Sequence, residues 1–245
     1  MARSAASLEL KLIGQRISRR ISMGKSLAGS AWNPKAMEIV EGERILVISP
    51  HPDDDAIGCG GAIIKAVSLG RKVRILYLSL PEIDAPSREA RKEEALAGLR
   101  AMGVTDFFLP EAEFPEGRAQ VSALITKGMA GFSPDMVLVP SPLENHDQHL
   151  MAFEAYMDLV RQGLEAPTCM YEVWGALVPN LVVDITKEWG RKAAAIAAHA
   201  SQVRKVDYVA MAGALNEYRA ISCGLKGRAE AFLQLDRRQV MEILG

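Results

Sequence analysis

The chain has 245 residues, of which 49% are hydrophobic, and its 29 basic and 30 acidic side chains give a formal net charge of −1. This composition suffices for a sizeable core, and we expect one large α/β domain rather than two small ones. The even charge balance argues against a nucleic-acid partner, which requires a concentrated basic face. The three cysteines are widely spaced and odd in number, which favours a reducing compartment over a disulfide framework.

The first 34 residues differ in composition from the rest of the chain. Apolar residues recur there at helical spacing, and Glu9 is the only acid among several basic residues. This pattern predicts a basic amphipathic segment and linker over 1–34, ahead of a single domain over 35–245. We expect the segment to dock on its own domain or on a neighbouring subunit of a homo-oligomer; membrane contact through residues 1–25 is the less favoured alternative. With no signal-peptide core and no run of ~18 apolar residues, we expect a cytoplasmic protein.

From residue 45 onward, short apolar runs alternate with segments of helical period. The apolar runs predict strands over 45–48, 73–78, 107–109, 135–139, 169–173 and 181–185. The intervening segments predict helices over 60–69, 88–102, 121–129, 150–160 and 187–200. Ser87 and Gly103 are suited to begin and end the second of these helices. Further covering helices are expected around Tyr208, Tyr218, Phe232 and Leu244. Such strand, helix, strand units favour parallel crossovers, so the sheet should be mostly parallel.

A histidine and three carboxylates follow the first predicted strand directly, at positions 51 and 53–55. Open α/β sheets place ligand sites at the carboxyl ends of their strands. Neighbouring carboxylates repel one another, and a metal ion would neutralise them. His51 and Asp54 could converge on one cation, with zinc favoured and iron as the weaker alternative. Asp53 would then be free to act as the base for a bound water. The alternative interpretation is an acidic helix cap beside an incidental histidine.

A second cluster follows the predicted strand over 135–139. Three of the four histidines of the chain lie just past the carboxyl ends of these two strands. His149 can complete a set of two histidines and one aspartate, which leaves open positions for water and substrate as in catalytic zinc sites. His146, about one helical turn earlier, would face the same cavity without binding the metal.

These two motifs, over residues 50–61 and 146–149, resemble the signature motifs of the PIG-L/LmbE-like family of zinc-dependent N-acetylglucosaminyl deacetylases. Further matches at 91–94, 183–185, 199–202 and 229–232 extend the resemblance from about residue 43 to residue 233. The resemblance implies an α/β, Rossmann-like single domain whose mostly parallel sheet is flanked by helices on both faces. It also implies hydrolysis of the acetamide of an N-acetylated sugar or sugar conjugate.

The resemblance assigns roles to individual residues. It implies one Zn²⁺ per chain, or Fe²⁺ as an alternative, held by His51, Asp54 and His149. Asp53 matches the general base, and His146 matches the residue that stabilises the oxyanion or protonates the leaving amine. Substrate contacts are expected from Arg91, Asp55 and Asn145.

Two positions depart from the family pattern. Asp55 stands where glutamate is usual, and Gln148 stands where an aspartate is usual. The second change removes a carboxylate that would hold His146 in its protonated form, unless Asp147 reaches it.

Two other functions stay open. Gly58, Gly60 and Gly61 suggest a nucleotide-binding Rossmann protein, although their spacing departs from the dinucleotide fingerprint and the preceding acids would repel phosphate. The changes at Asp55 and Gln148 suggest a metal-binding interaction subunit without catalysis. Tyr171 and Trp174 could form the wall of a sugar pocket, although core packing is the more common role of such rings.

Overall fold

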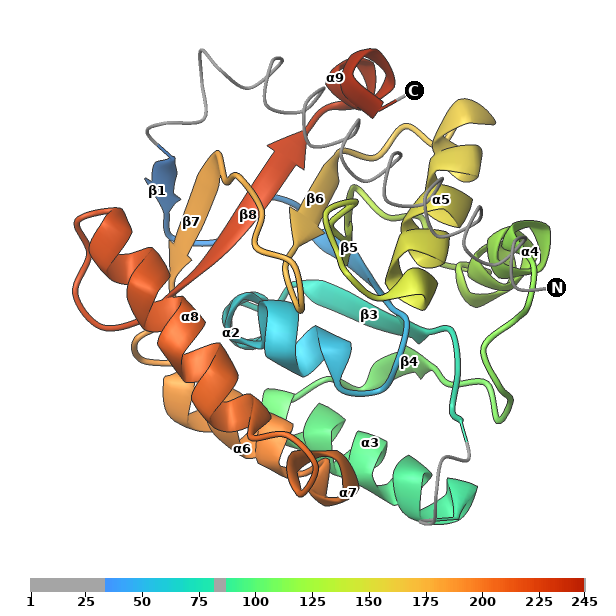
Figure 1. The fold of residues 1–245 in the computed structure, drawn as a ribbon. Coiled ribbons are helices and arrows are strands. Elements are labelled where there is room, and N and C mark those ends of the chain that lie inside the picture. Colours follow the sequence, from blue (N-terminus) through green and yellow to red (C-terminus); the bar gives the residue numbers. More distant parts are fainter. Residues whose placement is uncertain (1–33, 82–86, 245) are drawn as a thin grey trace, which may run out of the picture.

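The structure, a computed structural model, describes residues 34–81 and 87–244 (Figure 1). The predicted amphipathic segment and nearly all of the linker lie outside the described residues. Among the described residues, no helix is both long and apolar enough to cross a membrane.

The described residues contain one eight-stranded sheet, in the order β1-β7-β8-β6-β5-β2-β3-β4. The strands are β1 (Lys35–Met37), β2 (Arg44–Ser49), β3 (Lys72–Tyr77), β4 (Asp106–Phe108), β5 (Met136–Pro140), β6 (Thr168–Tyr171), β7 (Leu181–Asp184) and β8 (Ala229–Leu235). Every neighbouring pair is parallel except the two pairs that β8 makes with β6 and β7. The prediction of a mostly parallel sheet is therefore confirmed.

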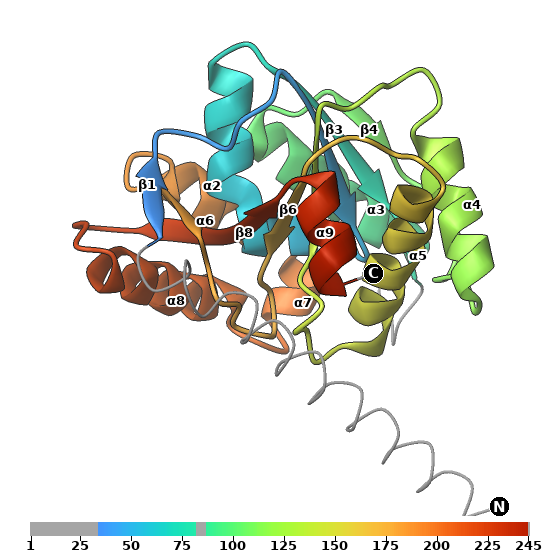
Figure 2. The same ribbon diagram turned by 90° about the horizontal axis from the view of Figure 1, so that it is seen from above.

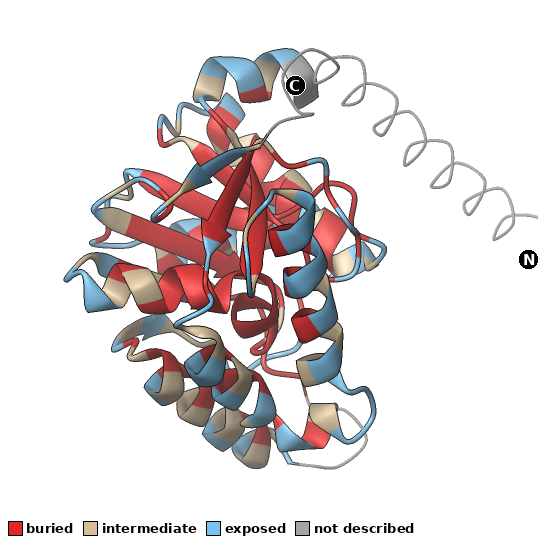
Figure 3. Ribbon diagram, turned by 90° about the vertical axis from the view of Figure 1, so that its left-hand side faces the viewer, coloured by how far each residue is buried: buried red, intermediate tan, exposed pale blue. Residues whose placement is uncertain are grey.

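Helices cover both faces of this sheet, as predicted (Figures 1 and 2). They are α2 (Asp54–Ser68), α3 (Arg88–Met102), α4 (Arg118–Gly128), α5 (Asp147–Arg161), α6 (Trp189–Ala197), α7 (Ala200–Val203), α8 (Tyr208–Ser222) and α9 (Arg237–Leu244). Alternate residues of β2 belong to opposite cores, because successive side chains of a strand point to opposite faces. Ile45 and Val47 pack under α2 and α6, whereas Leu46 and Ile48 pack under α4 and α5. Figure 3 shows the buried sheet between helices whose outer sides are exposed.

Local signals fix the ends of α3 as expected. The Ser87 side chain accepts a hydrogen bond from the backbone N–H of Ala90, and Gly103 ends the helix with φ of 79°. This left-handed conformation favours glycine because it has no Cβ.

Helix α2 begins at Asp54, earlier than the predicted residue 60, so the acidic motif forms its first turn. The helix is kinked at Cys59, and both carboxylate oxygens of Glu230 accept backbone N–H groups just beyond the kink, from Gly61 at 2.7 Å and from Ala62 at 2.8 Å. A Cβ at Gly58 would clash with the ring of Tyr171, so glycine allows the helix to lie this close to the sheet.

The covering helix expected around Phe232 is wrong. Phe232 lies on β8, which is inserted between β6 and β7 as an antiparallel strand. Its short apolar sequence fits either a strand or a helix, and pairing with two neighbouring strands decides between them.

The fold brings the two predicted motifs together. Strands β2 and β5 pair in parallel, with Ile45 opposite Met136 and Val47 opposite Leu138. The loops that follow their carboxyl ends therefore emerge side by side at one edge of the sheet.

Candidate active site

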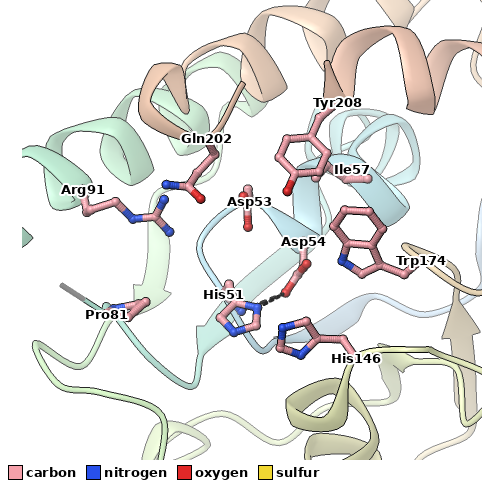
Figure 4. A pocket seen from close by; sticks show the side chains of 10 residues that line it. All are labelled: His51, Asp53, Asp54, Ile57, Pro81, Arg91, His146, Trp174, Gln202 and Tyr208. Carbon is pink, nitrogen blue, oxygen red and sulfur yellow. Dashed lines mark hydrogen bonds and ion pairs between the residues drawn. The ribbon is translucent and has the colours of Figure 1, made fainter. Parts of the chain in front are cut away.

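His51, Asp54 and His149 converge on one point. Their potential ligand atoms all lie within 4.8 Å of one another. Oδ2 of Asp54 lies 3.1 Å from Nδ1 of His51 and 3.1 Å from Nε2 of His149. His51 comes from the loop after β2, Asp54 begins α2, and His149 lies in the first turn of α5. Figure 4 shows the side chains of His51 and Asp54 pointing toward one another among those that line the pocket.

The other ring nitrogen of each histidine faces an acceptor oxygen. Nε2 of His51 donates to Oε1 of Gln148 at 2.6 Å, and Nδ1 of His149 lies 3.1 Å from Oε2 of Glu144. Such partners fix the ring orientation and leave the opposite nitrogen for a metal. Nε2 of His149 is buried, and in the described part of the chain it makes no hydrogen bond of good geometry, although it lies 3.1 Å from Oδ2 of Asp54. A nitrogen in this position beside a carboxylate suits a cation.

The charges of these side chains also fit a cation. Burial alone would raise the pKa of Asp54, but the charges of His149 and His51 outweigh burial and lower that pKa well below its usual range. Burial alone would lower the pKa of His149, but the neighbouring Asp54 and Glu144 raise it to about 10. The imidazolium of His149 thus neutralises Asp54, and a divalent cation can take the place of that proton. Two imidazole nitrogens and one carboxylate oxygen are a ligand set for a catalytic metal.

A cavity of about 130 Å³ opens beside this group, and Figure 4 shows the side chains that line it. Asp53 is one of them, and it is 7% exposed. It occupies the N-cap position of α2 but makes no side-chain cap hydrogen bond. Its carboxylate is therefore not engaged in capping the helix, as a general base requires.

His146 lines the same cavity and precedes α5. Its Nδ1 accepts the backbone N–H of Gln148 at 3.2 Å, so the neutral ring carries its proton on Nε2. Burial and the charges of His51 and His149 lower the pKa of His146. The side chain of Gln148 binds His51 and not His146. The side chain of Gln148, which departs from the family pattern, therefore orients the candidate metal ligand His51. His146 is oriented by the backbone N–H of Gln148 instead.

Arg91 also lines the cavity, from the first turns of α3. It is only 2% exposed, and its Nε and Nη1 have no hydrogen-bond partner among the described residues. Buried polar groups are usually paired. Unpaired donors beside a cavity point to an acceptor on a ligand.

Asp55 and Asn145, two expected substrate contacts, are not among the residues that line this cavity. Asp55 is fully buried, and its Oδ2 accepts the hydroxyl of Tyr77 at 2.9 Å. It is the second residue of α2, so its side chain turns toward β3 and away from the opening. Burial raises the pKa of Asp55 to about 8. Asn145 is exposed to solvent.

The carboxyl-terminal third of the chain contributes the opposite wall. Trp174, Gln202 and Tyr208 line the cavity, and the rings of Trp174 and Tyr208 meet edge to face with centroids 5.6 Å apart. Trp174 thus lies where a pocket wall was considered, whereas Tyr171 is fully buried and donates its hydroxyl to the carbonyl of Ile48. The sequence reasoning missed Gln202, Tyr208 and Glu144 as site residues. Gln202 belongs to a matched motif, and Glu144 lies two residues before His146, but neither position indicates its contacts.

The part of the chain that carries this site is similar to known proteins. The PIG-L family model, described as GlcNAc-PI de-N-acetylase, matches residues 46–160, which contain both motifs. Diacetylchitobiose deacetylase of Thermococcus kodakarensis is 25% identical over 193 residues, which cover 65% of this chain and 70% of that protein. 1D-myo-inositol 2-acetamido-2-deoxy-alpha-D-glucopyranoside deacetylase of Corynebacterium efficiens is 25% identical over 62% of this chain and 45% of that protein.

A solved structure shares the fold. N,N'-diacetylchitobiose deacetylase from Pyrococcus horikoshii superposes with a TM-score of 0.68 at 22% identity, covering 81% of this chain and 85% of that one. The candidate metal-binding group at the ends of β2 and β5 thus lies within the part of the chain that is similar to the PIG-L family.

Proposed function

We propose that this protein is a zinc-dependent deacetylase that hydrolyses the acetamide of an N-acetylated amino sugar or sugar conjugate. The observation that carries the proposal is the convergence of His51, Asp54 and His149 beside the Asp53 carboxylate in one cavity. The two curated relatives are both named as deacetylases of acetamido sugars. Two imidazoles and one carboxylate occur in both catalytic zinc and non-haem iron sites, and we favour zinc because hydrolysis needs a Lewis acid and no redox change.

His51, Asp54 and His149 would hold the zinc. A bound zinc ion would polarise the acetamide carbonyl and lower the pKa of a water molecule to about 7. Asp53 accepts the proton of the attacking water, whose oxygen forms the new bond to the carbonyl carbon.

His146 then acts on the tetrahedral intermediate. Its Nε2–H is suited to donate a hydrogen bond to the developing oxyanion, because Nδ1 is already occupied by the Gln148 backbone. Asp53 or His146 returns a proton to the leaving nitrogen, the C–N bond breaks, and acetate and the free amine are released.

The rest of the cavity recognises the sugar. Nε and Nη1 of Arg91, which have no hydrogen-bond partner among residues 34–81 and 87–244, are suited to bind hydroxyl or carbonyl oxygens of the substrate. Trp174, which is 40% exposed, offers a ring for stacking on a sugar face. Ligand pockets usually measure about 300–1,000 Å³. This cavity of about 130 Å³ therefore encloses only the reacting end of the substrate.

The test compares wild type with Asp53→Asn, which preserves size and removes the base. We expect about one zinc per chain by elemental analysis in both proteins. Wild type should release acetate from members of a panel of N-acetylated sugars, and Asp53→Asn should lose about 10²–10⁴-fold in kcat. Zinc binding without acetate release across the panel would favour the non-catalytic interaction subunit. Absence of zinc binding would contradict the proposal. The alternative of a nucleotide site is already disfavoured, because the carboxylates that precede Gly58, Gly60 and Gly61 would repel phosphate.

A further inference from the structure

Glu144 contacts both the candidate metal-binding group and a separate segment of the pocket wall. Glu144 is buried, and its two oxygens face four donors. Oε1 accepts the backbone N–H groups of Val173 at 2.8 Å and Gly175 at 3.2 Å. Oε2 accepts the N–H of Trp174 at 2.9 Å and lies 3.1 Å from Nδ1 of His149. One carboxylate therefore binds both a candidate metal ligand and the three-residue segment 173–175 that carries the Trp174 ring.

The backbone around Glu144 is packed tightly, which restricts movement of its carboxylate. Its N–H donates to the carbonyl of Ser141 in a tight turn at 3.2 Å. A Cβ on Gly175 would clash with the carbonyl of Leu143, so segment 173–175 lies directly against this turn. A shift of the Glu144 carboxylate must therefore move the His149 ring, segment 173–175, or both.

We propose that Glu144 is a positioning residue that couples metal binding at His149 to the aromatic wall of the pocket formed by Trp174 and Tyr208. The inference rests on the proposed function, since it requires a metal at His51, Asp54 and His149. By orienting the imidazole, Glu144 holds Nε2 toward the metal position. By binding three successive N–H groups, it sets the place of the Trp174 ring beside the substrate. Coupling of this kind is reciprocal, so metal binding should order segment 173–175.

A second buried acid provides a matched control. Glu172 anchors the same loop through the N–H of Leu177 at 3.0 Å and pairs with Arg219 at 2.6 Å. Among the described residues, no hydrogen bond or ion pair joins Glu172 to His149. Glu144→Gln and Glu172→Gln are isosteric and disturb the same loop, but only Glu144→Gln changes the group opposite Nδ1 of His149. The amide keeps one acceptor oxygen and loses the charge, and its NH₂ group then faces donors that both Glu144 oxygens accept.

The experiment measures zinc affinity by competition with a chromophoric chelator, together with kcat and KM, for wild type and both variants. Glu144→Gln should bind zinc about 10–100-fold more weakly, the usual effect of losing such a partner. Glu172→Gln should keep the zinc affinity, and KM should rise in both variants because both disturb the Trp174 wall. Unchanged zinc affinity in Glu144→Gln, or an equal loss in both variants, would overturn the inference while leaving the proposed function intact. Failure of wild type to bind zinc would overturn both.

Hydrogen exchange of the wild-type protein tests the same coupling without a variant, and it applies even if Glu144→Gln does not fold. Zinc loading should slow hydrogen exchange at the amides of residues 173–175 relative to chelator-treated protein. The amides of Glu43 and Arg44, which donate to Asp135 at the opposite end of the sheet, serve as the control and should not change. Equal exchange at 173–175 with and without zinc would contradict the coupling.

Discussion

Oε1 of Gln148 lies 2.6 Å from Nε2 of His51, although the two residues are 97 positions apart. A residue of the second motif thus orients His51, a candidate metal ligand from the first motif. The amide of Gln148, which stands where the resemblance leads one to expect a carboxylate, makes this contact. A neutral amide accepts this hydrogen bond without adding negative charge next to Asp54.

Gln148→Leu should weaken zinc binding by about 10–100-fold, because the His51 ring loses the acceptor that orients it. Chelator competition measures this change. The same substitution at Gln162, the exposed C-cap of α5, is the control and should leave the affinity unchanged. Equal affinity of Gln148→Leu and wild type would show that His51 is oriented by other contacts.

Arg91→Met should reduce activity and increase stability. The substitution removes two donors that the substrate would use, so kcat/KM should fall about 10–100-fold, mainly through KM. It also removes a buried guanidinium, two of whose nitrogens have no partner in the described part of the chain, so the free energy of unfolding should rise by about 1 kcal/mol. Steady-state kinetics and urea unfolding test the two parts. Reduced stability would mean that Arg91 stabilises the folded protein through its charge.

His199 should make the protein less stable in acid. Burial lowers the pKa of His199 in the folded protein, and the attraction of Asp53 offsets this only in part. Below the unfolded pKa of about 6.5, the unfolded chain binds a proton at His199 that the folded chain excludes. The free energy of unfolding therefore falls as pH decreases from about 6.5 toward the folded pKa, by at most about 1.4 kcal/mol per pH unit.

His199→Gln lacks this titration and should lose less stability than wild type between pH 7.5 and pH 5. Urea unfolding of both metal-stripped proteins at the two pH values provides the comparison. Parallel losses in the two proteins would show that other groups cause the acid sensitivity.

Lys192→Met should destabilise the fold by about 3–5 kcal/mol, because it leaves the buried carboxylate of Glu230 without its cation. Nζ of Lys192 lies 2.6 Å from Oε1 of Glu230, and both side chains are fully buried. The double variant Lys192→Met/Glu230→Gln should recover part of the loss, since it removes the uncompensated charge. In the exposed pair of Arg238 and Glu242, Arg238→Met should change stability by less than about 1 kcal/mol. Urea unfolding measures all three variants.

The sequence by itself determined the alternation of buried strands with helices, and the chemistry that follows two of the strands. Apolar runs such as Ile45–Ile48 indicate strands that are buried on both faces. Ser87 and Gly103 define the ends of a helix through hydrogen bonds to residues close to them in the chain. The convergence of His51, Asp54 and His149 in space could be expected for a related reason. Side chains that follow parallel strands emerge at the same edge of the sheet, and β2 and β5 are neighbours.

Only the tertiary structure decided where individual side chains turn and what they touch. Asp55 follows Asp54 in sequence, yet the helix turns it toward Tyr77 and away from the cavity. The contacts of Glu144 with segment 173–175, and of Gln148 with His51, join residues that periodicity does not relate. The insertion of β8 between β6 and β7 likewise depends on strand order. The local pattern of apolar and polar residues indicates how each segment is buried. Contacts between distant segments depend instead on the order of the strands and on how the helices pack on them.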